Sequence, residues 1–298
     1  MKIYAPKYYN DFKCIASACK HSCCIGWEID VDSQSLKKYC ESEAAYAKRI
    51  RESIDHDGAT HFKLSENERC PHLDDSGLCN IITELSEEYL CDICREHPRF
   101  YSNTKRGIFA GLGMACEEAA RIILSSDNYD SFIEISEIEG EVSCDFDAPA
   151  LCDKIYAILK NKEIPYERRL HAIYEKFGVS PEIISDSEWQ EELLSLEYLN
   201  ENDSKCIFST YTSETDTPPE SEDKISRALA YFIYRHTSSA VSAEDFRASL
   251  GLALFLERLL ATVVKADFTR EVEELGRIVS EEIEYSEENT DAIKNKFM

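Results

Sequence analysis

Thirteen cysteines in a chain of 298 residues constrain this protein more than any other feature of its sequence. Four of them lie within eleven positions, namely Cys14, Cys19, Cys23 and Cys24. A second group comprises Cys70, Cys79, Cys91, Cys94 and Cys116. The other four stand alone and are expected to be packed, inert thiols: Cys40, Cys144, Cys152 and Cys206. The density of the two groups requires disulfides, a metal site or reactive thiols.

The expected compartment bears on this choice. The first residues lack the apolar core of a signal peptide. No run approaches the ~18–20 apolar residues that cross a bilayer. We therefore expect a cytoplasmic protein without a membrane segment, and cytoplasmic disulfides are rare. The odd cysteine count also argues against complete pairing.

The chain is strongly acidic, with 58 Asp and Glu against 33 Lys and Arg and a formal charge of −25. Nucleic acid is not an expected partner, because phosphate binding requires clustered basic residues. A negative field attracts basic molecules, such as a lysine-bearing protein surface. Solubility alone also explains the charge.

Hydrophobic periodicity predicts a mainly α fold in two parts. Residues 1–127 form a cysteine-rich metal-binding part with short strands, and residues 128–298 form an all-helical part with a linker near 213–222. Residues 130–147 are acidic and partly β-like. The expected carboxy-terminal helices cover residues 148–161, 166–177, 186–201, 222–237, 243–265 and 268–285.

Within the first part, local signals predict how the cysteines are placed. A short strand is expected at 28–32 and a helix at 33–53. The turn at 74–77 folds Cys70 and Cys79 together. A helix over 81–96 stops before Pro98. Gly107, Gly111 and Gly113 are expected to make the chain flexible ahead of a helix that has Cys116 in its first turn.

Spaced thiols in a reducing compartment indicate a soft metal, either zinc or an iron–sulfur cluster. The plant-type cluster spacing and the paired zinc-ribbon spacing are both absent. The adjacent Cys23-Cys24 pair favours a multi-iron cluster, because neighbouring side chains diverge. The pair Cys91-Asp-Ile-Cys94 is also compatible with a thioredoxin-like redox motif, but the required strand–helix context is missing.

The ordered motifs of residues 4–124 resemble the flagellin lysine N-methylase family. The matching residues are Tyr8, Phe12-Lys-Cys14, Cys19, Cys23-Cys24-Ile-Gly26-Trp27, Cys70-Pro-His-Leu73-Asp74, Leu78-Cys79, Cys94-Arg95-Glu-His-Pro98-Arg99 and Cys116-Glu-Glu-Ala-Ala-Arg121. Cys91 stands where the family more often has serine, and Glu117 stands where it has proline. A broader group of cysteine-cluster zinc- or iron-chelating proteins shares part of the pattern.

The resemblance implies S-adenosylmethionine-dependent methylation of flagellin lysines and a cysteine-bound iron–sulfur cluster, of 4Fe-4S type, with zinc as the alternative. Its implied metal ligands are Cys14, Cys19, Cys23, Cys24, Cys70, Cys79, Cys94 and Cys116. Eight thiols exceed the four that one cubane cluster needs. The rival functions are a non-catalytic zinc or iron–sulfur protein with a structural or redox-sensing site, and a helical adaptor that binds a basic partner.

The catalytic residues are open, with Tyr8, Tyr101 and His97 as candidates, because aromatic faces and bases suit a cationic methyl transfer. Arg95, Arg99 and Trp27 are candidates for binding the cofactor or shielding the cluster. No Gly-rich strand–turn–helix marks a Rossmann-type cofactor site. The S-adenosylmethionine site is therefore expected to be unorthodox.

Overall fold

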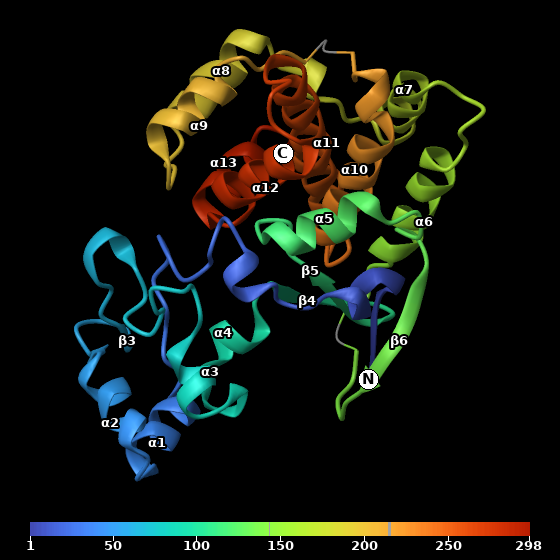
Figure 1. The fold of residues 1–298 in the computed structure, drawn as a ribbon. Coiled ribbons are helices and arrows are strands. Elements are labelled where there is room, and N and C mark those ends of the chain that lie inside the picture. The colour runs from blue at the N-terminus through green and yellow to red at the C-terminus, as the bar shows by residue number, and fades with distance from the viewer. Residues whose placement is uncertain (143, 214–215) are drawn as a thin grey trace. The chain divides into compact units, whose positions relative to one another are not determined.

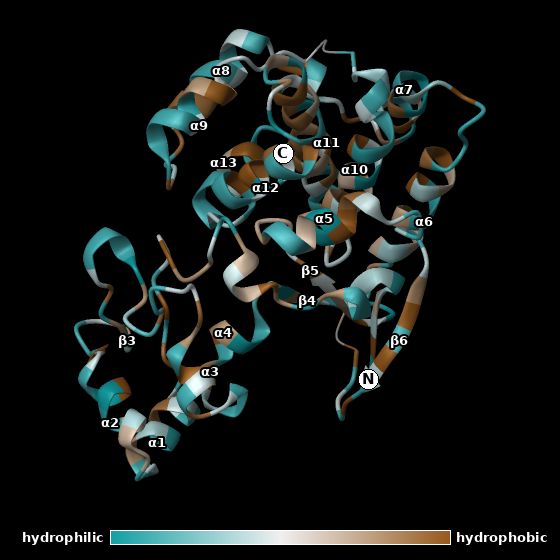
Figure 2. Ribbon diagram, in the orientation of Figure 1, coloured by the Kyte–Doolittle hydropathy of each residue, from teal (hydrophilic) through white to brown (hydrophobic). Residues whose placement is uncertain are grey.

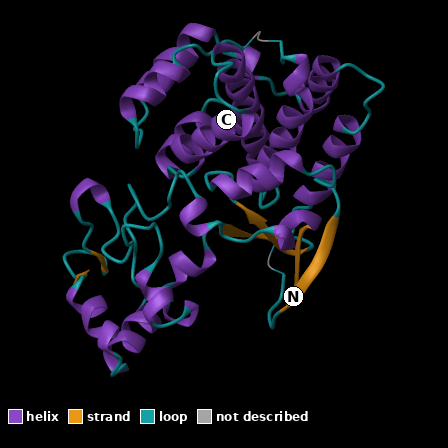
Figure 3. Cartoon of the chain, viewed as in Figure 1, coloured by secondary structure: helices purple, strands orange, loops and turns teal. Residues whose placement is uncertain are grey.

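The computed structural model describes residues 1–142, 144–213 and 216–298. It contains a four-stranded mixed sheet. Its strands are β1 (Lys2–Pro6), β4 (Arg99–Thr104), β5 (Gly107–Leu112) and β6 (Phe132–Glu137). They are ordered β4-β5-β1-β6, so β4 and β6 are the edges. Figure 3 draws the strands in orange among the purple helices. β1 pairs parallel with β5 and antiparallel with β6, while β4 and β5 form a hairpin.

Glycines allow the strands of this sheet to approach closely. Gly107 has a φ of +126°, and a Cβ there would lie 2.4 Å from the carbonyl oxygen of Lys2. A Cβ on Gly111 would lie 2.3 Å from the ring of Phe100 on the paired strand. The expectation that glycines loosen the chain here is wrong, because these two glycines sit in a buried strand where only hydrogen fits.

Helices make up most of the remaining chain (Figure 1). After the sheet strand β5 come α5 (Glu117–Ser125), α6 (Ala148–Leu159), α7 (Tyr166–Phe177), α8 (Asp186–Ser195), α9 (Glu201–Phe208), α10 (Glu222–Thr237), α11 (Ala243–Ala266), α12 (Val272–Val279) and α13 (Glu287–Asn295). A π-helical turn, Ser280–Glu284, follows α12. Short 3-10 helices are η1 (Lys7–Asp11), η5 (Pro181–Ile183) and η6 (Pro219–Ser221).

α11 is the central element of this helical core. Its side chains are buried from Phe246 to Val264 with one exception, and Figure 2 shows its largely apolar sequence. Trp189 of α8 packs on Phe255 with ring centroids 4.2 Å apart. Ser242 caps the helix by accepting the Asp245 N–H, as Ser185 does for α8 in a full capping box. Within the described ranges, no helix is both long and apolar enough to traverse a bilayer.

The described residues form two compact units. The sheet unit contains residues 1–12 and 99–298, and the cysteine unit contains residues 13–98. The cysteine unit has short elements: α1 (Ser33–Glu41), α2 (Ala45–Glu52), β2 (Ile54–Asp55), β3 (His61–Phe62), α3 (Asn80–Glu84), α4 (Asp92–Glu96), η2 (Ala16–Ala18), η3 (Glu66–Glu68) and η4 (Glu87–Tyr89). The boundary expected at residue 127 falls inside the sheet unit, between α5 and β6.

The carboxy-terminal helices match the sequence pattern closely at α7, α10 and α11, where strong apolar periodicity coincides with clear ends. Residues 128–298 are not all helical, because β6 belongs to the sheet. The helix expected at 186–201 is broken between α8 and α9. The helix expected at 268–285 begins later, at Val272, and continues from α12 into the π-helical turn, and α13 is an additional helix that the sequence pattern does not predict. The linker expected near 213–222 contains residues 214–215, which lie outside the described ranges.

The expected helices of the cysteine unit are also broken. The 33–53 helix divides at Ser42, whose hydroxyl accepts the Ala44 N–H and whose carbonyl accepts a hydrogen bond from Arg51. The 81–96 helix divides at Leu85 and the extended residue Ser86. The strand expected at 28–32 is reduced to a single bridge between Asp30 and His61. α4 does end before Pro98, as predicted.

Candidate metal centre

The small core of the cysteine unit gathers five thiols. It is built on aromatic and aliphatic side chains such as Tyr39, Ile50 and Phe62. Five cysteines are buried in it or pack against it: Cys24, Cys70, Cys79, Cys91 and Cys94. A core of this size has few apolar residues, so the thiols form a large part of its contents.

The backbone joins the first cysteine group to the second. The Cys70 N–H donates to the carbonyl of Cys24 at 2.8 Å, and the Gly26 N–H donates to Glu68 at 3.0 Å. Ile25 and Arg69 form an antiparallel bridge between these hydrogen bonds. Gly26, two residues after Cys24, has a φ of +83°, a conformation that favours glycine. The Cys-Cys-x-Gly motif is therefore a short strand-like pairing partner for Cys70.

A tight turn then returns the chain from Cys70 to Cys79, as predicted. One Asp74 carboxylate oxygen accepts the backbone N–H groups of Ser76 and Leu78, both at 2.8 Å. Gly77 adopts a φ of +80° at the end of the turn. An antiparallel bridge between Leu73 and Cys79 closes the hairpin.

Cys91 and Cys94 complete the group from the last helix of the unit. Cys91 directly precedes α4 and Cys94 lies one turn along it, and their Sγ atoms are 3.4 Å apart. Two thiolates on one tetrahedral zinc ion are separated by ~3.8 Å, given Zn–S bonds of ~2.3 Å. This pair therefore has a separation close to that of two ligands sharing one ion.

The five thiols influence one another electrostatically. Burial, together with the nearby Cys24, Cys79 and Cys91, raises the pKa of Cys70 to about 12. Burial also raises the pKa of Cys79. A hydrogen bond with Cys91 and burial raise the pKa of Cys94, while the same bond lowers the pKa of Cys91. A hydrogen bond with Cys23 lowers the pKa of Cys24 to about 7 against the effect of burial.

The raised pKa values of Cys70, Cys79 and Cys94 favour their protonated thiols, and a bound cation would stabilise the thiolates instead. Soft thiolates of this number suit zinc or an iron–sulfur cluster chemically. Among the described residues, no three Cys, His, Asp or Glu side chains already stand at metal-binding distances. The donor set therefore fits such a group, while binding would have to draw the thiols closer than they lie here.

The other cysteines predicted as ligands lie outside this core. Cys14 and Cys23 are exposed, and Cys14 Sγ accepts the Ala16 N–H. Cys19 is half-buried, and its thiol donates to the His21 carbonyl at 3.2 Å. Cys116 belongs to the sheet unit, where it precedes α5 and packs against the main core.

His72 is engaged by its neighbours rather than available to a metal. Its Nδ1 lies 3.1 Å from the Tyr46 hydroxyl, and its Nε2 lies 2.9 Å from the Ser53 hydroxyl. The Phe62 ring meets it edge-on at 4.8 Å. Burial and then the charge of Arg49 lower the pKa of His72 to about 4, so the ring is neutral. We interpret His72 as a structural residue of the cysteine core.

The candidates for catalysis and cofactor binding are divided between the units. His97, Arg95 and Trp27 lie in the cysteine unit. Burial lowers the pKa of His97 to about 4, Arg95 pairs with Asp92, and Trp27 is half-buried outside the thiol core.

Tyr8, Arg99 and Tyr101 lie in the sheet unit. Arg99 stacks over Tyr9 at 5.7 Å and Phe12 at 5.4 Å. Tyr8 is buried, which raises the pKa of its hydroxyl well above the ordinary value and makes it a poor base. Tyr101 is 50% exposed and so remains accessible to a substrate.

Comparison with known proteins supplies the deciding observation. The chain is 32% identical over 129 residues to the flagellar biosynthetic protein FliU of Salmonella muenchen, covering 75% of that protein and 40% of this one. It is 31% identical over 129 residues to the lysine-N-methylases of Salmonella choleraesuis and Salmonella typhimurium, again over 40% of this chain. This chain belongs to the flagellin lysine N-methylase family.

The alignments cover only 32% of each of those two lysine-N-methylases, so the chain matches about a third of their length. No family model matches the chain, and no solved structure is significantly similar to it. The alignments behind the family relation therefore cover 40% of the chain.

The family motifs do not include Cys91, yet the structure places its thiol in the same core as Cys70, Cys79 and Cys94. The two-residue spacing between Cys91 and Cys94 was the signal available in the sequence. Among the isolated cysteines, Cys152 is buried beside Thr237 as expected. Cys40 and Cys206 are exposed, so the expectation that they are packed is wrong.

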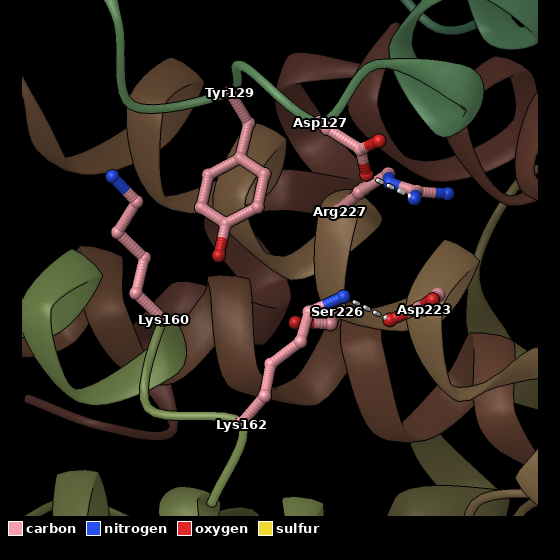
Figure 4. A pocket seen from close by; sticks show the side chains of 7 residues that line it. All are labelled: Asp127, Tyr129, Lys160, Lys162, Asp223, Ser226 and Arg227. Carbon is pink, nitrogen blue, oxygen red and sulfur yellow. Dashed lines mark hydrogen bonds and ion pairs between the residues drawn. The ribbon is translucent and has the colours of Figure 1, made fainter.

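A surface pocket of about 270 Å³ lies in the sheet unit and is lined by Asp127, Tyr129, Lys160, Lys162, Asp223, Ser226 and Arg227 (Figure 4). Its cations already have carboxylate partners. Arg227 pairs with Asp127 at 2.5 Å, and Lys162 pairs with Asp223 at 2.8 Å. Lys160 pairs with Asp130. We therefore interpret the pocket as a depression closed by surface ion pairs rather than as a ligand site.

Proposed function

We propose that this protein methylates lysine side chains of flagellin with S-adenosylmethionine as methyl donor. The observation that carries the proposal is the relation to proteins named lysine-N-methylase and FliU. The charge of −25 supports it, because a negative field attracts a lysine-bearing protein surface. The chain is then a cytoplasmic transferase whose partner is a protein.

In the proposed reaction, the substrate nitrogen must first lose a proton and become neutral. The nitrogen lone pair then forms the new N–C bond as the methyl–sulfur bond breaks, and its electron pair passes to sulfur. S-adenosylmethionine supplies the methyl group as a sulfonium when bound. The protein's contribution is alignment, together with aromatic faces that hold cationic groups, and the half-exposed Tyr101 is an accessible candidate.

We further propose that the cysteine unit holds an iron–sulfur cluster. The gathering of Cys24, Cys70, Cys79, Cys91 and Cys94 in one core supports this, since four thiolates suffice for one cluster. Cys14, Cys19 and Cys23 belong to the same unit and remain candidate ligands. The cluster would supply folding energy and neutralise ionised thiols, and no catalytic step is assigned to it.

A structural zinc site is the second candidate, and one observation favours it. The 3.4 Å separation of Cys91 Sγ and Cys94 Sγ suits two ligands of a single tetrahedral ion. A zinc protein of this kind would need no enzymatic activity. The two candidates differ in metal, in colour and in activity.

Two measurements on protein purified without oxygen test these proposals. Flagellin is incubated with the protein and S-adenosylmethionine, and mass spectrometry counts the added methyl groups. Methylated lysines are expected, and their absence with several flagellins would contradict the enzymatic proposal. Visible absorption near ~400 nm with matching iron and sulfide is expected for the cluster, whereas colourless protein with stoichiometric zinc would support the second candidate.

A further inference from the structure

The outer strand of the sheet, β6, presents an unpaired edge. One side of β6 pairs with β1, and no strand within the described residues pairs with the other side. The Ile138 N–H donates to the Met1 carbonyl at 2.9 Å, and the Met1 amino group donates back to the Ile138 carbonyl at 2.5 Å. In a regular antiparallel stretch these groups alternate, so Glu137, beside Ile138, directs its N–H and C=O groups outward. A register shift between Ile3 and Tyr4 interrupts this alternation farther along β6.

The inner face of β6 is fixed to the sheet unit. Phe132 stacks on Phe109 with ring centroids 5.8 Å apart, and on Tyr234 with centroids 5.2 Å apart. Ile135 packs against the same core. The packed side chains of Phe132 and Ile135 already fix the position of β6. A strand that binds its outer edge would therefore not pay the entropy cost of ordering β6.

The edge is acidic along its length. We call residues 132–142 the β6 edge; they comprise β6 and the five residues that follow it. They contain four glutamates and no Lys or Arg. Glu134 pairs with Lys2 at 2.6 Å. Among the described residues, Glu137, Glu139 and Glu141 form no ion pair, and residues 136–142 are all exposed. These three carboxylates are available to cations from a partner.

The opposite edge of the sheet has the opposite charge character. β4 begins at Arg99, and Lys105 and Arg106 follow it in the turn. A basic segment is therefore attracted to β6 and not to β4. The β6 edge also carries Ile138 and Val142, which are 42% and 43% exposed and offer apolar contacts between the carboxylates.

We propose that the β6 edge binds an extended, lysine-bearing segment of a partner protein as an additional strand. Backbone hydrogen bonds to the outward groups of β6 provide the affinity, and Glu137, Glu139 and Glu141 select lysine over acidic residues. The inference rests on the proposed function in one respect, since the segment then belongs to the methylated protein. It describes how the substrate is held, apart from where the methyl group is transferred.

The carboxylates have an alternative explanation. Charged residues on edge strands protect sheets from pairing with other copies of the same chain. In that case neutralising the glutamates makes the protein self-associate, and basic peptides gain nothing from the strand. The two explanations differ in whether a peptide with a normal backbone is recognised.

Binding of designed peptides to the full chain tests the proposal without S-adenosylmethionine. The probe is a fluorescent peptide in which Lys alternates with Thr, and binding is measured by anisotropy at low salt. A second peptide has Glu in place of Lys, and a third keeps Lys but has alternate backbone nitrogens methylated. Only the first is expected to bind, and it should slow amide hydrogen exchange within residues 132–142.

Matched variants of the protein complete the test. The triple change Glu137→Gln, Glu139→Gln and Glu141→Gln is expected to weaken binding about tenfold, while the protein remains monomeric. The control triple neutralises three exposed glutamates elsewhere on the sheet unit, Glu175→Gln, Glu191→Gln and Glu220→Gln, and is expected to leave binding within about twofold of the unmodified protein.

Three results would each overturn the proposal. The N-methylated peptide could bind as tightly as the unmodified Lys peptide, or the control triple could weaken binding as much as the β6 triple. The amides of residues 132–142 could also exchange at the same rate with and without the peptide. Self-association of the β6 triple variant without peptide binding would establish the protective explanation instead. Failure of the proposed function is separate: peptide binding at β6 without methylation of any flagellin would retain this inference and reject the enzyme. Methylation of flagellin without peptide binding at β6 would retain the enzymatic proposal and reject this inference.

Discussion

The backbone N–H of Cys70 donates to the carbonyl of Cys24 at 2.8 Å, which ties the two cysteine groups of the chain together. The adjacent bridge between Ile25 and Arg69 extends this pairing. Near the thiols, the cysteine unit is therefore stabilised by backbone hydrogen bonds between segments that are distant in sequence, as well as by apolar contacts. A bound metal would add to this framework, so metal content and stability should change together.

Replacing Cys91 by serine is expected to reduce metal content and to destabilise the cysteine unit. Its thiol is fully buried 3.4 Å from that of Cys94, so no other donor replaces it easily. The expected loss is about 3 kcal/mol or more, a fraction of the ~10–16 kcal/mol that a structural zinc site contributes. Metal analysis and urea unfolding measure the two effects.

Cys40→Ser is the matched control for that experiment, because Cys40 lies in the same unit and is exposed. It should retain full metal content and normal stability. If Cys40→Ser and Cys91→Ser behave alike, the thiol core is not the metal site.

Replacing His72 by glutamine should destabilise the protein without removing metal. Both ring nitrogens of His72 are already within hydrogen-bond distance of the Tyr46 and Ser53 hydroxyls. Leaving the buried Tyr46 hydroxyl without its histidine partner costs about 1–3 kcal/mol, while the Ser53 hydroxyl still donates to the Ile50 carbonyl. Metal content per folded chain should stay the same, and a loss of metal at unchanged stability would show that His72 is a ligand.

Gly77→Ala tests the hairpin between Cys70 and Cys79. Gly77 has a φ of +80°, and an added Cβ would lie 3.4 Å from the backbone of Ser17. A side chain in this conformation costs about 1 kcal/mol. Thermal unfolding should register a small decrease, whereas Gly140→Ala, at a second positive φ outside this unit, should leave metal binding unchanged.

The sequence predicted the turns and helices that depend on neighbouring residues. The Asp74–Gly77 turn and the helices α7, α10 and α11 follow from capping residues, turn residues and apolar periodicity. The sheet was missed because its strands come from distant segments: β1 at the amino terminus pairs with β5 and β6. Strands of five or six residues carry too little periodicity to reveal such pairing.

In the candidate metal centre, too, the sequence predicted what residue spacing determines and missed what tertiary packing determines. The spacing of Cys23-Cys24, Cys70 and Cys79 predicted a shared site, and the structure places Cys24, Cys70 and Cys79 in one core. The family resemblance does not include Cys91 among its implied ligands, because the family more often has serine there, although Cys91 is one of the most buried thiols. Burial depends on tertiary contacts that no single motif encodes.

A buried charge cluster links α10 to the π-helical turn of the sheet unit. The Glu284 carboxylate is fully buried and accepts hydrogen bonds from His236 Nε2 at 2.6 Å and the Tyr231 hydroxyl at 3.2 Å. Arg235 lies 3.3 Å from it, with Phe100 and Tyr285 rings on its sides at 4.8 and 4.9 Å. Glu284→Gln removes the charge that balances Arg235.

The cost of that change depends on pH. Burial raises the pKa of Glu284, but the charge of Arg235 and the bond from His236 lower it more, so the net pKa is below its usual value. A depressed folded-state pKa stabilises the protein above the unfolded-state value of ~4.3 and loses this effect as pH falls through the folded-state pKa. The unmodified protein should therefore exceed Glu284→Gln in stability most clearly at neutral pH.

Urea unfolding at neutral pH should show a loss of about 3 kcal/mol for Glu284→Gln, because a buried charge is left without its partner. The difference from the unmodified protein should shrink as the pH falls below the unfolded-state value of ~4.3 and through the lowered folded-state pKa of Glu284. Glu288→Gln, an exposed change on α13, should stay within about 0.5 kcal/mol at each pH. A difference that does not depend on pH would mean that packing around Glu284, rather than its charge, stabilises this junction.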